Sequence, residues 1–323
     1  MKDLRAIALF ALVVMLVPAL SASGVMLNFV MTALYACLLA QAWNILGGFG
    51  GQFSFGHALF FGTGAYAQAI LQLDAHLNAW LALPLACATG ALVGAGVGAI
   101  SFRYGLKGSY FALVTLAFAE VFRIVALSVP FTGAGVGLML PLQSSGGAMQ
   151  FESRAGFVWL MLALVTAGLL LTAWLRHSRF GAYLQAVRDN EDAARAVGVN
   201  PLRVKLLATV MSAALMSAGG AMYVQIFQYI DPGIAYGPHT SVEALVGAIV
   251  GGMGTLWGPV VGALALHILA DLTRNLFGQL PGINMVIYGS VLILIVMFLP
   301  RGIAGSAVSV RTLWLRTSER RDT

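Results

Sequence analysis

The sequence predicts an all-α protein, a polytopic transmembrane helical bundle of about ten spans with broken helices. Of its 323 residues, 59% are hydrophobic and 9% are charged, whereas a soluble domain carries roughly 25% charged residues. Apolar runs of about 20 residues, the length of helix that crosses a bilayer core of about 30 Å, recur along the chain. No polar stretch is long enough for a soluble domain, so we expect residues 1–323 to form a single transmembrane domain.

The apolar segments are candidate spans. The first one mimics a secretory signal, with Lys2 and Arg5 before an apolar run. Because another span follows almost at once, we expect this segment to remain as a transmembrane helix, with cleavage as the alternative. The candidate spans are residues 6–23, 25–46, 52–73, 79–101, 110–128, 157–174, 201–225, 240–253, 257–273 and 284–299.

Two glycine-rich stretches interrupt these spans. The sequence GGMGTLWGP at 251–259 separates two short segments, and GGFGGQFSFG at 47–56 is a break of the same kind. Unpaired backbone groups are tolerated at membrane depth only inside protein or beside a water-filled path. Both breaks are therefore candidate parts of a pathway between internal repeats, although no two parts of the sequence match each other convincingly.

Glycine also recurs at every fourth residue within single spans. Such stripes let two helix backbones approach closely in lipid, so we interpret them as packing surfaces. The stripes are Gly90, Gly94 and Gly98; Gly254, Gly258 and Gly262; and the pair Gly247 and Gly251.

The basic residues predict the orientation. The net charge of +6 would also suit a nucleic-acid partner, but the basic residues stand in short loops and in the tail, where an excess of Lys and Arg marks the cytoplasmic side. We therefore expect a lipid bilayer, and no nucleic acid, around a chain whose two termini are both inside. The inner groups would be Arg103, Lys107, the 175–205 loop and the basic tail 302–323 with Arg301, and the clearly outer ones Arg154 and Arg274.

The loop 175–205 is the one polar island of the chain. Six of its residues are basic: Arg176, Arg179, Arg188, Arg195, Arg203 and Lys205. We expect a short helix over 190–197, with Asp189 as its cap, and small residues that would let another protein sit close. Glu191 and Asp192 suit its first turn and Arg195 its last, and the small residues are Ala193 and Ala194. Gly198 can end this helix, and Asn200 with Pro201 can start the next one.

No motif indicates chemistry within the chain. The sequence contains no P-loop, CxxC, HExxH or EF-hand pattern, so we expect no nucleotide hydrolysis, metal or cofactor. Cys37 and Cys87 lie inside apolar runs and are interpreted as small hydrophobic residues. Ser54 and His57 lack a third orienting group and an oxyanion donor, so we interpret them as polar packing of a broken helix.

Ionisable groups inside apolar segments are candidates for a transport path, because charge at membrane depth is costly. Glu120 and Arg123 are three residues apart and can pair on their own helix. Glu243 follows Thr240 by three residues, which fits a capping box. A similar stripe near an outer helix end is formed by His267, Asp271 and Arg274. The pathway candidates are Gln52, Ser54, His57, Glu120, Glu243 and Thr255.

Six segments that cover most of the chain in order are similar to those of a known family. They are GQFSFGHALFFGTGAY (51–66), GSYFALVTLAFAEVFR (108–123), TGAGVGL (132–138), GAYLQAVRDNEDAARAVGVNPLRVK (181–205), VEALVGAIVGGMGTLWGPVVGA (242–263) and LPRG (299–302). With these segments, the chain resembles the permease subunits of bacterial ABC importers for branched-chain amino acids, of the LivM type.

The resemblance implies an ABC importer permease fold and a function. Residues 191–198 would be the coupling helix that fits a cleft on a cytosolic ATPase. The partners would be a second related permease, two cytosolic ATP-binding subunits and a periplasmic amino-acid-binding protein, in the bacterial inner membrane. The alternatives are a permease of the same family for amides or urea, an ion-coupled secondary transporter, whose only strong coupling candidate is Glu120, and a membrane enzyme, for which we find no residue constellation.

Overall fold

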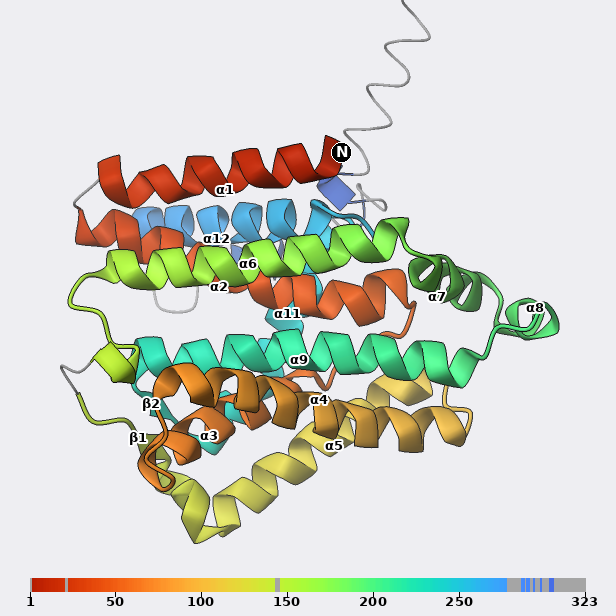
Figure 1. Ribbon diagram of the computed structural model, residues 1–323, viewed down its shortest axis with the longest axis horizontal. Coiled ribbons are helices and arrows are strands. Elements are labelled where there is room, and N and C mark those ends of the chain that lie inside the picture. The colour runs from red at the N-terminus through yellow and green to blue at the C-terminus, as the bar shows by residue number, and fades with distance from the viewer. Residues whose placement is uncertain are drawn as a thin grey trace, which may run out of the picture.

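The computed structural model describes residues 2–20, 23–142 and 146–277, together with residues 286–287, 289–290, 293, 297 and 302–304. Long helices run side by side along one direction of the bundle (Figure 1). Six described helical stretches are long and apolar enough to cross a membrane. They are α1 (Lys2–Leu20), α2 (Gly24–Trp43) with its continuation to Phe49, α4 (Ala79–Arg103), α5 (Gly108–Ser128), α6 (Arg154–His177) and α9 (Pro201–Phe227).

Three further helices occupy predicted spans. These are α3 (His57–Leu73), α11 (Pro238–Gly251) and α12 (Gly258–Phe277). The expected all-α polytopic bundle is therefore confirmed, with helix ends that fall within a few residues of the predicted ones, except at the start of α3. The expected span 284–299 and the expected tail 302–323 lie outside the described residues, apart from the few positions named above.

The first glycine break starts later than the sequence predicts. Residues Asn44–Phe49 continue α2 as a π-helix, η1, so Gly47 and Gly48 are still helical. The chain then leaves the helix and runs without regular structure to Gly56, and α3 begins at His57 rather than at 52. The second break lies where predicted, between the end of α11 at Gly251 and the start of α12 at Gly258.

The two longer connections at one end of the bundle, α5–α6 and α9–α11, are joined to each other. Strand β1 (Leu138–Met139) pairs antiparallel with β2 (Tyr229–Ile230), with Leu138 opposite Ile230. Both strands lie at one end of the bundle, and the short helix α8 lies at the other (Figure 1). Short helices complete these connections: η2 (Pro130–Thr132), η3 (Ala134–Val136), η4 (Gly146–Ala148) and α10 (Pro232–Tyr236).

Helix α9 lies at the centre of the bundle and packs against α3 and α4 through small residues. A Cβ at Gly94 of α4 would lie 2.5 Å from the Cβ of Ala213, and Gly90 lies equally tightly against Ser217. On α3, the backbone of Gly64 meets the backbone of Ser217. The glycine stripe of α4 therefore forms a helix-packing surface, as the sequence predicts.

Gly94→Leu should separate α4 from α9, because overpacking a tight contact costs about 1–3 kcal/mol. The matched control is Gly96→Leu on the same helix, since a Cβ at Gly96 meets nothing within 4 Å. Thermal unfolding of the detergent-solubilised protein measures the difference. Equal midpoints in the two variants would contradict this packing.

Candidate functional site

Two short helices project from one end of the bundle, α7 (Arg179–Asp189) and α8 (Glu191–Ala196) (Figure 1). The predicted cap of α8 was wrong by one residue. Asn190, with extended backbone, accepts hydrogen bonds from the N–H groups of Asp192 and Ala193, both at 3.0 Å. Asp189 is the last residue of α7, and its carboxylate contacts Arg188 at 3.1 Å. The cap belongs to the residue directly before the first helical one, and the helix begins at Glu191.

The end of α8 follows the sequence prediction. Gly198 has φ of +89°, a left-handed backbone that glycine adopts without steric cost. The side chain of Asn200 accepts a hydrogen bond from the N–H of Arg203 at 3.2 Å, and Pro201 is the first residue of α9. The joint between α8 and α9 is therefore short and conformationally defined.

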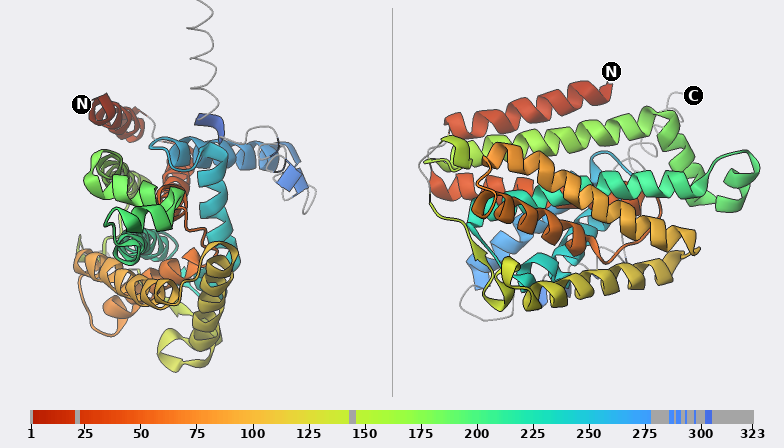
Figure 2. Two further views of the ribbon diagram at one scale, coloured as in Figure 1. Left: turned by 90° about the vertical axis from the view of Figure 1, so that its right-hand side faces the viewer. Right: turned by 60° about the horizontal axis from the view of Figure 1, so that its bottom comes forward.

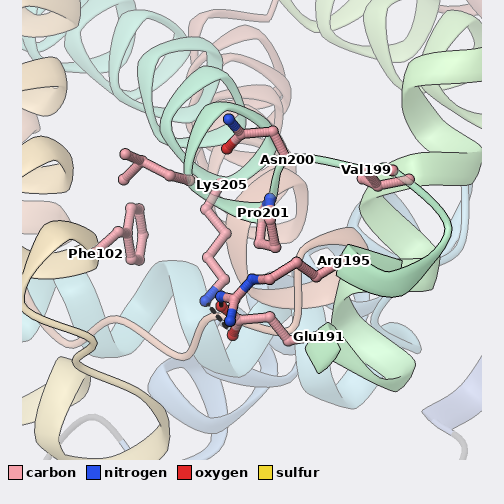
Figure 3. A pocket seen from close by; sticks show the side chains of 9 residues that line it. Phe102, Glu191, Arg195, Val199, Asn200, Pro201 and Lys205 are labelled. Carbon is pink, nitrogen blue, oxygen red and sulfur yellow. Dashed lines mark hydrogen bonds and ion pairs between the residues drawn. The ribbon is translucent and has the colours of Figure 1, made fainter. Parts of the chain in front are cut away.

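A single carboxylate holds α8 against the bundle. Glu191 Oε2 lies 2.7 Å from Lys205 Nζ on α9 and 3.2 Å from Lys107 Nζ in the α4–α5 connection. Arg195 Nη2 approaches the other oxygen at 3.3 Å. These groups converge beside a cavity of about 400 Å³, with Phe102 on its other side (Figure 3). Lys205 also lies over the Phe102 ring, 5.4 Å from the ring centre.

Burial and charge act in opposite directions on Glu191. The side chain of Glu191 is 15% exposed and that of Lys205 is 4% exposed. Burial alone raises the pKa of Glu191, but hydrogen bonds from Lys205 and Lys107 outweigh it, so the pKa lies below its usual value. The ion pairs of ionised Glu191 therefore stabilise the folded protein above the usual glutamate pKa, and this stabilisation is lost as the pH falls through the lowered pKa.

Helix α8 has one inner and one outer face. Ala194 is 3% exposed and packs with Leu184 and Val204 in a small apolar core. Ala193 is exposed, and Val197 is 80% exposed. The expectation that both alanines face outwards is therefore corrected: Ala194 anchors α8 to its own chain, and Ala193 is available to another protein.

A second set of contacts connects α7 to the two breaks. Arg188 Nη1 donates a hydrogen bond to the carbonyl oxygen of Gly48 in η1, at 3.1 Å. Asn44, fully buried one turn earlier, accepts from Gly254 N at 2.7 Å and donates to the carbonyl of Thr255 at 3.0 Å. The two breaks therefore lie side by side; the first is bonded directly to α7, and the second is linked to it through Asn44.

A family model described as the permease component of branched-chain amino acid transport systems matches residues 25–297. This chain belongs to that family. The match spans α2 to α12, both breaks and the α7–α8 loop, and it confirms the resemblance to ABC importer permeases seen in the sequence.

Individual relatives cover most of the permease. The high-affinity branched-chain amino acid transport system permease protein LivM of Salmonella typhimurium is 29% identical in a match that covers 84% of this chain and 68% of the relative. LivH of the same kind of system in Escherichia coli is 26% identical over 83% of this chain and 90% of the relative. The ribose import permease protein RbsC of Escherichia coli is 27% identical over 73% of each chain. No solved structure gives a significant match.

The polar candidates near the first break do not form a catalytic pair. His57 Nε2 lies 2.9 Å from Ser212 Oγ, which itself donates to the carbonyl of Ala42 at 2.6 Å. Ser54 Oγ accepts from Gly56 N at 3.2 Å. Both side chains are fully buried. They join α3, α9 and α2 of the permease, in line with the interpretation as polar packing.

Near the breaks, Thr255 and Gln52 bond to local backbone. The Thr255 hydroxyl donates to Gly252 O at 2.7 Å and accepts from Gly258 N at 3.0 Å. Gln52 Nε2 donates to Gly50 O at 3.1 Å, while its Oε1 is buried without a hydrogen-bond partner among the described residues. Of the two, the Gln52 oxygen has more capacity left for a passing polar group.

Glu120 and Glu243 lie on different helices. Arg123 contacts both carboxylate oxygens of Glu120, at 2.6 and 2.9 Å, and this pair is partly exposed on α5. The predicted Thr240–Glu243 capping box was wrong, because α11 already begins at Pro238 with Gly237 as its cap. Gly237 and Pro238 set the start of α11, and Thr240 lies within its first turn.

Sequence reasoning missed the partners that give the loop its rigidity. Lys107 and Lys205 counted only as charges for topology, and Arg188 as one basic loop residue among six. Asn44 did carry a signal, since it is an amide that directly precedes a glycine-rich break in an apolar span. Its partner, 210 residues away, could not be identified without the fold.

Glu191→Ala should loosen α8, because it leaves the buried Lys205 ammonium unpaired at a cost of about 3 kcal/mol. Asp192→Ala is the matched control: it removes a carboxylate from the same helical turn, but Asp192 is 83% exposed and lies 3.7 Å from its nearest cation. Amide hydrogen exchange of α8 should accelerate only in the first variant. Equal exchange in both variants would rule out the clamp.

Proposed function

We propose that the protein is the membrane-spanning permease subunit of a bacterial ABC importer for branched-chain or other small amino acids. A periplasmic binding protein delivers the cargo, two cytosolic ATP-binding subunits supply the energy, and a second related permease completes the path. The family match supports the permease role. The observation that carries the coupling is the fixed attachment of α8 to the bundle through Glu191.

The coupling works as a lever. Force applied to the exposed face of α8 reaches α9 through Lys205 and the α4–α5 connection through Lys107. It reaches the breaks through Arg188, whose guanidinium holds Gly48 O. A rigid element that moves as one body can convert closure of the ATP-binding subunits into a rearrangement of the spans. Ala193 and Val197, both exposed, form the part of α8 that contacts a partner.

The distribution of charge supports an inner-membrane protein with an inner N-terminus. Asp3 of α1 pairs with Arg176 and contacts His177, which places the N-terminal end of α1 beside the α7–α8 loop. Lys107, Arg188 and the other basic residues of this loop lie at the same end of the bundle. An excess of basic residues marks the cytoplasmic side, so this end of the bundle faces the cytosol. By the same rule, we infer that the basic C-terminal tail is also on the cytoplasmic side.

An ion-coupled carrier is less well supported. Glu120 is the coupling candidate that the sequence offers for such a carrier, and both of its oxygens already contact Arg123. A membrane enzyme would need a reactive constellation, and His57, the buried histidine nearest to a serine, is committed to a hydrogen bond with Ser212.

Ala193→Arg should abolish uptake while insertion and abundance persist, because a long charged side chain separates α8 from its partner. The control is Ala75→Arg, an exposed loop position between α3 and α4 at the opposite end of the bundle. Uptake of labelled leucine by cells and copurification of the cytosolic subunits are the readouts. Wild-type uptake in Ala193→Arg would disprove docking at α8.

Uptake by the reconstituted complex should require ATP and the loaded binding protein, and it should persist when ion gradients are collapsed. The accumulation of labelled leucine in proteoliposomes measures this uptake, and an amide and urea are tested as competing cargoes. If uptake survives ATP depletion but stops when the ion gradient is collapsed, the protein is a secondary carrier and the importer proposal is wrong. If only urea is taken up, the proposed cargo is wrong but the importer proposal stands.

A further inference from the structure

A cavity of about 500 Å³ opens between α2, α11 and α12. Sites for small molecules occupy roughly 300–1,000 Å³ and combine an apolar wall with a few polar groups. Here the wall includes Ala36, Leu266 and Ala270. The polar groups include the carboxylate of Glu243 on α11 and the guanidinium of Arg274 on α12.

The two charges are available to a ligand. Within the described part of the chain, neither Glu243 nor Arg274 forms an ion pair or a side-chain hydrogen bond. The neighbouring His267, by contrast, is held by Thr32 Oγ1 at 3.1 Å and packs against the Phe29 ring. His239 also lines the cavity and acts electrostatically on Glu243, and Arg274 is exposed. A carboxylate at membrane depth without an ion pair is costly, so a cationic group of a ligand would stabilise Glu243, and the exposed Arg274 can bind an anionic group.

The charges of the spans are concentrated on one side of the bundle. In the described long helices, every Asp, Glu, Lys or Arg that is at least five residues from both helix ends belongs to α5, α11 or α12. These residues are Glu120, Arg123, Glu243 and Asp271. Figure 2 (left) shows α5 and α11 on the side of the bundle opposite to α6. Away from the helix ends, the exposed large side chains of α4 and α6 are apolar, including Leu92 and Leu170, which suits lipid on that side.

We propose that this cavity binds the transported amino acid as a zwitterion, with its ammonium group at Glu243, its carboxylate at Arg274 and its side chain against the wall of Ala36, Leu266 and Ala270. The assignment rests on the proposed function and adds a binding site to it. A guanidinium can hold a carboxylate through two parallel hydrogen bonds. An amino acid carries one ammonium and one carboxylate group, so its two charges are opposite in sign to those of Glu243 and Arg274.

The position of the cavity suits the arrival of cargo. Glu243 lies in the second turn of α11, which follows β2 and α10 at the end of the bundle opposite to α8. Arg274 lies in the last turn of α12, which runs back towards the same end. The zwitterion therefore binds near the face that receives it, and the breaks lie deeper along the path.

The first test uses the reconstituted complex with its binding protein and labelled leucine. Glu243→Gln and Arg274→Gln should each lower uptake at least tenfold, while ATP hydrolysis stimulated by the loaded binding protein is retained. Asp271→Asn is the matched control, because Asp271 bonds to Asn275 on the same helix at 3.2 Å and does not line the cavity. Full uptake in both cavity variants would overturn the proposal.

The second test measures occupancy without transport. Ala270→Cys, in a background with Cys37→Ala and Cys87→Ser, places a thiol in the wall of the cavity of the assembled complex. Free leucine should slow its reaction with a maleimide at least fivefold, and leucinamide, which lacks the carboxylate, should not. Absence of protection by leucine overturns the site even if a charge variant assembles poorly.

The two proposals fail differently. If the wild-type complex hydrolyses ATP but moves no amino acid, the proposed cargo is wrong and the site with it. If the wild-type complex moves leucine and the cavity variants do so equally well, the importer stands and the zwitterion site alone is rejected.

Discussion

In a bilayer every backbone N–H and C=O must find a partner within the protein or in a water-filled path, and this constraint shapes the centre of the permease. Two glycine-rich breaks interrupt its helices, and each would leave unpaired backbone groups. Asn44 meets part of this need, because its side-chain amide both accepts from Gly254 N and donates to Thr255 O. The close approach needs glycine, since a Cβ at Gly48 would collide with Asn44 and with the backbone of Gly254. Broken helices are therefore stable here because one break completes the other.

The same junction connects the membrane to the loop outside it. Arg188 extends from α7 to the carbonyl of Gly48, and a Cβ at Gly51 would collide with the Arg188 side chain. Glu191 ties the neighbouring helix to α9 and to the α4–α5 connection. A displacement of α7 and α8 therefore acts on elements that lie far apart in the sequence. In the proposed importer, this arrangement would transmit a movement of α7 and α8, caused by separate ATP-binding subunits, into the spans.

Charge divides the permease into two sides. Helices without charged residues in the middle of their length, such as α4 and α6, cover one side, and mid-span charges occur on α5, α11 and α12. The Glu120–Arg123 pair is neutral as a whole and is partly exposed on α5. Glu243 and Arg274 line a common cavity. Since lipid solvates neither sign of charge, the side with these residues is the one that faces cargo, water or another subunit.

The sequence by itself determined the class of fold, the helices and the character of the α7–α8 loop. Apolar length, glycine breaks and Asn-Pro or Gly signals are local properties, and they predict spans, breaks and helix ends within a few residues. The errors were local too: Asn190 rather than Asp189 caps α8, α3 begins at His57, and Thr240–Glu243 is not a cap. Only the tertiary structure decided which side chains meet, because ion pairs such as Glu191–Lys205 and contacts such as Asn44–Gly254 join residues whose separation carries no periodic signal. It also decided that Ala194 faces inwards while Ala193 faces out, since burial depends on what packs against a helix and not on the residue type alone.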